Sequence, residues 1–173
     1  MKKSSGLLIA LATMAAGLVS GCATFDMSSV VPGTSVAQVE AAVGQPTDKF
    51  TAPGGDSVWF YSRLPYGRVA YAVRIGADGK VLNVEQRLTE ENTKKIVAGK
   101  MTREDVRMLL GSPNYITNYP RLNVETWEYP MVPGSMSLWM MLYVDFSSDG
   151  MVRDSWYTVD PVRNYLFVGG EKS

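Results

Sequence analysis

One short stretch, residues 101–113, constrains the fold of this chain most, because both ends of a helix are marked in it. Thr102 is a good N-cap residue, and Asp105 follows three positions later, where its carboxylate can bond to the free amides of the first turn. An apolar stripe recurs at helical spacing, formed by Val106, Leu109 and Leu110. Gly111 favours the end of a helix, and Pro113 prevents its continuation. The stretch therefore predicts one short amphipathic helix.

The same design occurs earlier in the chain, at residues 34–46. Ser35 is the N-cap residue there, Gln38 is its capping partner, and Gly44 and Pro46 are the stop signals. The apolar stripe consists of Val39, Ala42 and Val43. The glycine and proline stops of the two stretches lie 67 residues apart in the sequence.

The same order of features follows each of these helices. A Trp-x-Tyr pair comes first, then an alternating apolar strand, and then an Asp-Gly turn. The matched positions are Trp59, Tyr61, Val73, Ile75, Asp78 and Gly79 in the first copy, and Trp127, Tyr129, Val144, Phe146, Asp149 and Gly150 in the second. The spacing between the copies grows from 67 to 71 residues, and only in places that read as loops. The pattern indicates a tandem duplication of two units rather than a solenoid.

Each unit is expected to be α+β, with one or two short helices packed on a three- to four-stranded antiparallel sheet. We expect the first unit at 33–87 and the second at 88–160, after a docked tether at 22–32 and before a tail at 161–173. A polar helix is predicted over 89–98. Strands are predicted at 58–63, 69–76, 81–87, 114–119, 124–131, 137–146 and 151–158, with a further edge strand at 164–168.

Residues 1–21 have the pattern of an export signal rather than of a folded element. A basic start at Lys2 and Lys3 precedes a short apolar run, residues 7–18, which is too short to span a membrane comfortably. The run closes on Val-Ser-Gly directly before Cys22, the only cysteine of the chain. This arrangement resembles the bacterial lipobox. The alternative is an ordinary secretory signal with an incidental cysteine, which would have no disulfide partner within the chain.

The lipobox resemblance implies that Cys22 carries a diacylglyceryl group, that the chain is cleaved after Gly21, and that the new amino terminus receives an acyl chain such as palmitate. Three acyl chains bury many methylene groups, at roughly 0.8 kcal/mol per CH₂, so the attachment would be close to permanent. Ala23 stands where, in other bacterial lipoproteins, an aspartate favours retention at the inner membrane. The expected location is therefore the outer membrane, with the chain anchored by lipid and facing the periplasm.

The composition argues against catalysis and against nucleic-acid binding. The chain has no histidine, which excludes Ser-His and Cys-His nucleophile pairs and histidine metal sites. It has no glycine-rich phosphate loop, and capping and turn formation explain the carboxylates at helix starts and hairpin turns. Loss of Lys2 and Lys3 with the signal leaves 15 basic and 17 acidic residues, a net charge of −2. We therefore expect no enzyme, no cofactor, no metal, no nucleic acid and no small-molecule substrate.

The second unit resembles the SmpA/OmlA family of outer-membrane lipoprotein domains, which are also called BamE-like. The resemblance rests on Gly-Lys-Met-Thr-x-Glu-Asp-Val, Leu-Gly-Ser-Pro, Trp-x-Tyr and Asp-Gly; it covers residues 89–158, and a less complete copy covers 31–86. It implies helices on an antiparallel sheet and a non-catalytic, protein-binding or scaffold role in outer-membrane assembly or envelope integrity. An envelope protein is the implied partner, with the barrel-assembly machinery as one candidate. The tandem arrangement resembles the β-lactamase inhibitory protein, which implies an alternative: a membrane-anchored inhibitor of a periplasmic or extracellular enzyme.

Bulky apolar side chains mark a candidate partner-binding face on the second sheet. If alternation sets the core face of the strand at 137–146, then Trp139, Met141 and Tyr143 point away from the helices. The matching strand positions of the first unit carry alanines. An open face of this kind usually marks an interaction site. The alternative is a cover within the chain, by the first unit or by residues 165–167. The Trp-x-Tyr pairs are assigned to the cores under the helices.

Overall fold

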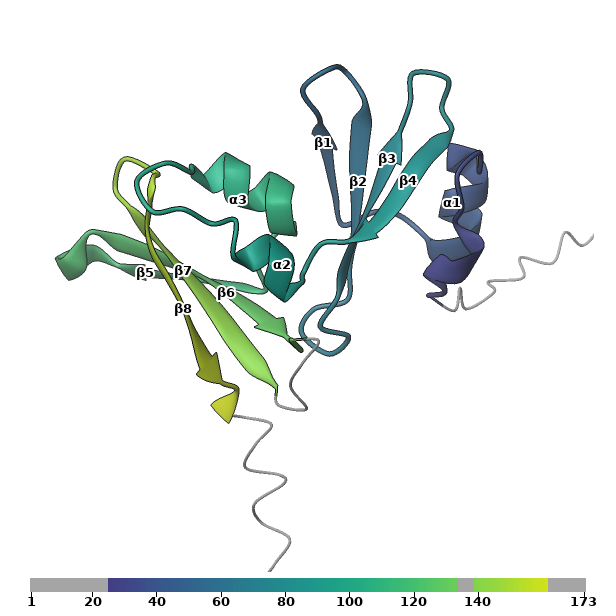
Figure 1. Ribbon diagram of the computed structural model, residues 1–173. Coiled ribbons are helices and arrows are strands. Elements are labelled where there is room, and N and C mark those ends of the chain that lie inside the picture. Colours follow the sequence, from purple (N-terminus) through teal and green to yellow (C-terminus); the bar gives the residue numbers. More distant parts are fainter. Residues whose placement is uncertain (1–24, 134–138, 162–173) are drawn as a thin grey trace, which may run out of the picture.

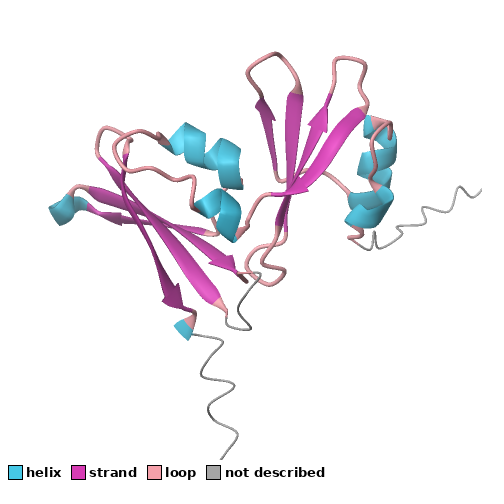
Figure 2. Cartoon of the chain, in the orientation of Figure 1, coloured by secondary structure: helices cyan, strands magenta, loops and turns pink. Residues whose placement is uncertain are grey.

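The structure is a computed structural model that describes residues 25–133 and 139–161. It contains two four-stranded antiparallel sheets, in the strand orders β1-β2-β3-β4 and β5-β6-β7-β8, together with a few short helices (Figures 1 and 2). The predicted α+β class in two units is confirmed. The predicted signal segment, Cys22 and the predicted edge strand at 164–168 lie outside the described residues.

Each sheet is a meander that follows its helix or helices in the chain. The first unit consists of η1 (Met27–Ser29), α1 (Val36–Val43), β1 (Asp48–Thr51), β2 (Ser57–Ser62), β3 (Ala70–Ile75) and β4 (Val81–Gln86). The second unit consists of α2 (Glu90–Thr93), α3 (Arg103–Leu110), β5 (Tyr115–Tyr119), η2 (Pro120–Leu122), β6 (Val124–Met131), β7 (Met140–Ser147) and β8 (Val152–Val159).

The predicted capping boxes are present in both α1 and α3. The Ser35 amide donates to the Gln38 side chain at 3.0 Å, and the Gln38 amide donates to the Ser35 hydroxyl at 3.4 Å. The same pair of bonds joins Thr102 and Asp105, at 2.8 and 3.2 Å. Both helices end at glycines with positive φ, Gly44 (84°) and Gly111 (86°). Local side-chain chemistry therefore sets both ends of each helix.

The duplication extends to individual backbone hydrogen bonds. The amide of Val36, at the start of α1, donates to the carbonyl of Gly79 in the hairpin turn of its own sheet, at 3.1 Å. The amide of Arg103, at the start of α3, donates to the carbonyl of Gly150 in the equivalent turn, also at 3.1 Å. The register also shifts at equivalent places, between Arg74 and Ile75 and between Asp145 and Phe146. Each helix is thus tied by its N-terminus to the turn of its own sheet.

The polar helix predicted over 89–98 is shorter than expected, because α2 ends at Thr93. After that residue the hydrogen bonds follow the tighter i→i−3 pattern. The amide of Lys95 donates to the carbonyl of Asn92, and the amide of Ile96 donates to the carbonyl of Thr93. The amide of Gly99 then donates to β8 at 2.8 Å. Contact with the sheet therefore replaces the last helical turns.

Two apolar cores lie between the helices and the sheets. The first is enclosed by α1 and its sheet and contains Val30, Val39, Val43, Trp59, Tyr61, Val73, Ile75 and Val81. The second lies under α2 and α3 and includes Leu88, Val106, Leu110, Trp127, Tyr129, Met131, Leu142, Val144, Phe146 and Val152. Both Trp-x-Tyr pairs are buried, as predicted. Phe25 and Met27 pack on the first core, so the described part of the tether docks on the first unit.

The outer face of the first sheet packs against the second unit. Phe60 and Ala72 are buried there together with Met108 of α3, and Gly111 lies against the Phe60 ring. The hydroxyl of Ser112 donates to Asp48 at 2.8 Å. The layers therefore run α1, first sheet, α3, second sheet (Figure 1). The sequence analysis expected helices on one face of each sheet and did not place this second cover.

Candidate protein-binding face

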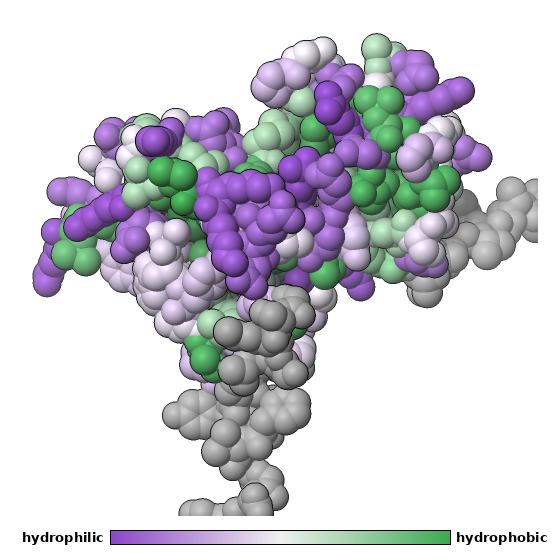
Figure 3. Space-filling view, viewed as in Figure 1, coloured by the Kyte–Doolittle hydropathy of each residue, from purple (hydrophilic) through white to green (hydrophobic). Residues whose placement is uncertain are grey.

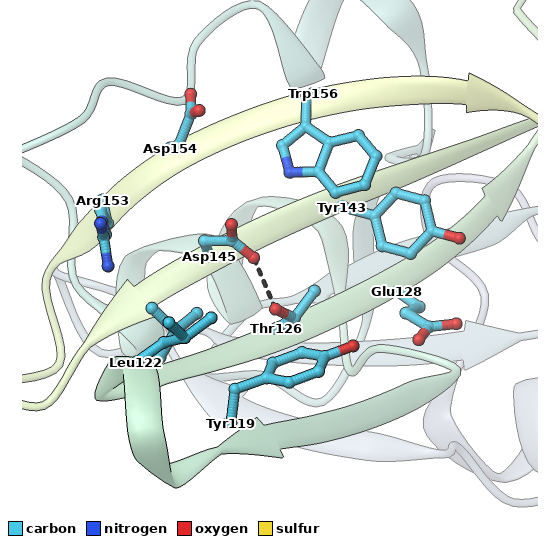
Figure 4. A pocket seen from close by; sticks show the side chains of 10 residues that line it. Tyr119, Leu122, Thr126, Glu128, Tyr143, Asp145, Arg153, Asp154 and Trp156 are labelled. Carbon is cyan, nitrogen blue, oxygen red and sulfur yellow. Dashed lines mark hydrogen bonds between the residues drawn. The ribbon is translucent and has the colours of Figure 1, made fainter.

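The outer face of the second sheet, on the side opposite α3, carries a row of large side chains. The strand register places Tyr115, Glu128, Tyr143 and Trp156 opposite one another across all four strands. The adjacent row consists of Thr117, Thr126, Asp145 and Asp154. Figure 4 shows Tyr143 and Trp156 side by side, with Asp145 and Thr126 below them. The face therefore combines an aromatic row with a polar, acidic row.

Tyr143 and Trp156 form the centre of the aromatic row. Their rings stack at 4.3 Å between centroids with an interplanar angle of 16°, and Trp156 keeps 42 % of its surface exposed. Burial, followed by the charge of Glu128, raises the pKa of the Tyr143 hydroxyl above its ordinary value of 10.0. The hydroxyl therefore stays protonated at neutral pH and can donate a hydrogen bond.

A groove of about 520 Å³ runs beside this pair. Tyr119 and Leu122 border it and remain well exposed, and Arg153 and Asp154 lie at its far end (Figure 4). In its floor the Thr126 hydroxyl donates to the Asp145 carboxylate at 2.6 Å. Exposed apolar groups around such a hollow are typical of protein-contact surfaces.

The three residues predicted from the sequence lie at one end of this face, in unequal settings. Met141 is opposite Pro130 and is buried, with 9 % of its surface exposed. Trp139 is half-buried and stacks under the guanidinium of Arg68 from the first unit, 4.3 Å from its ring centroid. Tyr143 is half-buried in the aromatic row. The first unit therefore covers part of the Trp139 end of the face, whereas the Tyr143 end is more open among the described residues.

Trp156 was not predicted as part of this face, and the register places it directly opposite Tyr143. Simple strand alternation gave the wrong face, because Trp156 lies four positions after the core residue Val152 and would share its face in a regular strand. Cross-strand pairing, however, requires the register, and a bulge between Asp145 and Phe146 shifts it by one residue.

The equivalent face of the first unit has a different use. Its corresponding row is Asp48, Phe60, Ala72 and Glu85. There Phe60 and Ala72 are buried against α3. At the 71-residue offset, Ala72 corresponds to Tyr143. The same face is thus covered within the chain in the first unit, and in the second unit it has aromatic side chains instead.

The remaining surface offers fewer candidates. Figure 3 shows hydrophilic side chains across the middle of the viewed side. Apolar side chains form separate patches on either side of them. Among the described residues, no group of three or more histidines, cysteines or carboxylates could hold a metal ion. In the same part of the chain, no helix has the length and apolar character needed to cross a bilayer.

Comparison with known proteins finds a family likeness for the second unit. Residues 86–155 match the family model for the outer membrane protein assembly factor BamE domain. Over these residues the second unit is similar to a BamE domain. This confirms the resemblance inferred from the capping, stop and Trp-x-Tyr motifs, and the match spans α2, α3, β5 to β7 and the first half of β8.

The BamE-like domain occurs here beside a second copy of the same motif order, and wider comparisons give only distant likenesses. No curated protein matches the chain. A DUF4309 family protein (YjgB) from Bacillus subtilis is 17 % identical, covering 73 % of this chain and 79 % of its own, with a TM-score of 0.31. A proposed β-lactamase inhibitor protein from Streptococcus mutans is 14 % identical, covering 79 % and 89 %, with a TM-score of 0.28. Only the BamE match bears on function.

Proposed function

We propose that this chain is an outer-membrane lipoprotein, facing the periplasm, that acts as a non-catalytic binding or scaffold module in outer-membrane assembly or envelope integrity. The observation that carries the proposal is the BamE match over residues 86–155. Cys22 is the lipid-attachment residue in this proposal, residues 1–21 are the signal, and 22–32 are the tether. The units at 33–87 and 88–160 form the binding module, and 161–173 is the tail.

The partner-binding part of the proposal is the outer face of the second sheet. Trp139, Met141 and Tyr143 belong to it, and Trp156 joins them because it stacks on Tyr143. An exposed aromatic pair gains free energy when a partner covers it, at about 25 cal/mol per Å² of apolar surface buried. Tryptophan, tyrosine and methionine are also enriched in interface cores.

Lipid attachment is tested by growing the producing cells with a radioactive fatty acid. The parent chain should take up label and migrate in the outer-membrane fraction, whereas Cys22→Ala should take up none. Equal labelling of both proteins would refute Cys22 as the attachment site. A soluble mature protein would refute the anchor altogether.

The partner class is tested by capture from detergent-solubilised envelopes. Recovery of barrel-assembly components supports the assembly role, and recovery of a hydrolase supports the alternative role of an anchored enzyme inhibitor. A Tyr143→Ala/Trp156→Ala double change should weaken capture strongly, whereas unfolding stability should fall by about 1 kcal/mol for the aromatic pair and by the further apolar burial that the two partly exposed rings lose. Leu82→Ala is the matched control, because Leu82 is a comparably exposed apolar residue on β4 of the other unit. Equal loss of capture in both variants would argue against the face.

A further inference from the structure

A second groove, of about 390 Å³, joins the outer face where the first unit meets it. Its walls come from both units. Pro65 and Tyr66 of the loop between β2 and β3 form one wall, and Pro130, Met141 and Tyr143 form the other. Tyr143 also lines the groove of Figure 4, so the two hollows adjoin at that residue. Tyr66 is 82 % exposed, which leaves an aromatic ring at the rim without a cover among the described residues.

Arg68 fixes this loop to the second unit. Its side chain is 6 % exposed and pairs with the equally buried carboxylate of Asp160. It also donates to the carbonyl of Met140 at 3.3 Å and lies over the Trp139 ring. Breaking a buried ion pair is costly because it leaves a charge without its partner. The two walls of the groove are therefore held in one arrangement, and the site is incomplete in either unit alone.

The charge of the combined hollow is negative. Glu128 lines both grooves, and Asp145 and Asp154 line the first. None of these three carboxylates takes part in an ion pair among the described residues. Of the two arginines in the hollow, Arg68 is neutralised by Asp160, and Arg153 lies at the far end beside Asp154. A segment that fills the hollow gains most if it brings positive charge next to apolar surface.

We propose that this two-unit groove binds a segment of a partner protein in which an apolar side chain enters between Tyr66 and Met141 and neighbouring lysines or arginines meet Glu128 and Asp145. This inference rests on the proposed binding function and goes beyond it, because it makes the first unit part of the binding site and defines the chemistry of the bound segment. The first unit is then needed for recognition, and the second unit alone would not bind this segment.

The test uses a photo-reactive phenylalanine analogue, introduced one position at a time into the full chain in the cells that produce it. The positions are Tyr66, Tyr143 and, as a remote control, Leu82. Irradiation should give adducts to the same partner from Tyr66 and Tyr143 and none from Leu82. Mass spectrometry of the adducts should find lysine or arginine within a few residues of the cross-linked position.

Several outcomes would overturn the inference. These are adducts to residues 162–173 of the same chain, adducts to a second copy, partner peptides without basic residues, or adducts from Leu82 alone. If envelope capture recovers a partner but no adduct forms at Tyr66 or Tyr143, the binding function stands and the groove assignment fails. If neither experiment finds a partner, both fail.

The cross-linked partner peptide, made synthetically, then serves as the probe for affinity. Glu128→Gln and Asp145→Asn should each weaken its binding up to about fivefold at low salt, with the difference shrinking as salt is raised. Tyr66→Ala should weaken it at all salt concentrations, and Leu82→Ala should not change it. Affinity that is insensitive to Tyr66→Ala would show that the first unit is not part of the site.

Discussion

The two units contain a matched pair of buried tyrosines whose hydroxyl groups differ in one respect. The hydroxyl of Tyr129 donates to the carbonyl of Gly111 at 3.0 Å in the second core. Its counterpart Tyr61 is 2 % exposed, but its hydroxyl has no hydrogen-bond partner among the described residues. Burial raises the pKa of both hydroxyls, and with a further contribution from Glu40 that of Tyr61 reaches about 12. Both groups are therefore neutral at physiological pH.

The two tyrosine-to-phenylalanine variants should differ in their effect on the free energy of unfolding. Tyr129→Phe leaves the buried carbonyl of Gly111 without its donor, which costs about 1–2 kcal/mol of unfolding free energy. That cost lowers Tm by about 2–8 °C in a protein of this size. Tyr61→Phe removes a buried hydroxyl that forms no bond, so stability should stay the same or rise by up to about 1 kcal/mol.

The assay is urea unfolding of the parent chain and both variants, followed by tryptophan fluorescence, because each core contains a tryptophan from its Trp-x-Tyr pair. The shape of the side chain is unchanged by either substitution, so each variant is the steric control for the other. If Tyr61→Phe destabilised the protein as much as Tyr129→Phe, the assignment of the first hydroxyl as unpartnered would be wrong. A neutral Tyr129→Phe would refute the contribution of the hydrogen bond.

The helix ends give further predictions. Gly44→Ala should lower the free energy of unfolding by about 1–3 kcal/mol, because the residue has positive φ and extended ψ. Gly111→Ala should lower it more, because its new Cβ would also lie 2.8 Å from the buried Phe60 ring. Equal losses, measured from urea unfolding midpoints, would contradict the packing of the two units. Hydrogen bonds from the backbone amide and then the hydroxyl of Thr102 hold the pKa of Asp105 below its ordinary value of 3.8. Stability from this carboxylate is therefore complete above that value and is lost as pH falls through the lower folded pKa, so Asp105→Asn should flatten the acid limb of a stability–pH profile. An acid limb that is the same in Asp105→Asn as in the parent would show that this carboxylate does not contribute to the pH dependence of stability.

The short-range part of the fold follows directly from the sequence. Capping side chains and glycine stops specify α1 and α3 locally, and the Asp-Gly turns specify the hairpins, so the copies can be aligned without a structure. In both turns the aspartate side chain accepts from the amide two residues later, at 3.1 Å in each. Such interactions lie within a few residues of one another, and residue type alone is enough to predict them. The length predicted for the polar helix was wrong for the opposite reason. After Thr93, contacts with β8 outweigh the helix propensity of the residues.

The contact between the units could not be predicted in the same way. The alanines at 70 and 72 give no sign in the sequence that they are covered, although Ala70 is buried in the second core and Ala72 against α3. The usable signal was in β2, where Val58 to Tyr61 form an unbroken apolar run and are all buried. A run of that kind indicates a strand covered on both faces. It does not say which element provides the cover, since that depends on contacts between residues far apart in the sequence.

The different use of the two outer faces bears on where a partner can bind. A stack that joins the first sheet to α3 leaves two outer surfaces, the exposed side of α1 and the outer face of the second sheet. The most exposed residues of α1 are Ala37, Gln38 and Ala41, which offer little apolar area, and the nearby Glu40 carboxylate is paired with Lys49. In the first sheet, the small side chain of Ala72 lets Met108 of α3 approach. In the second sheet Tyr143 stands at the equivalent position, so a third unit could not stack there in the same way. Divergence from the stacking pattern, together with an aromatic and acidic surface, therefore favours a partner of different shape at that face.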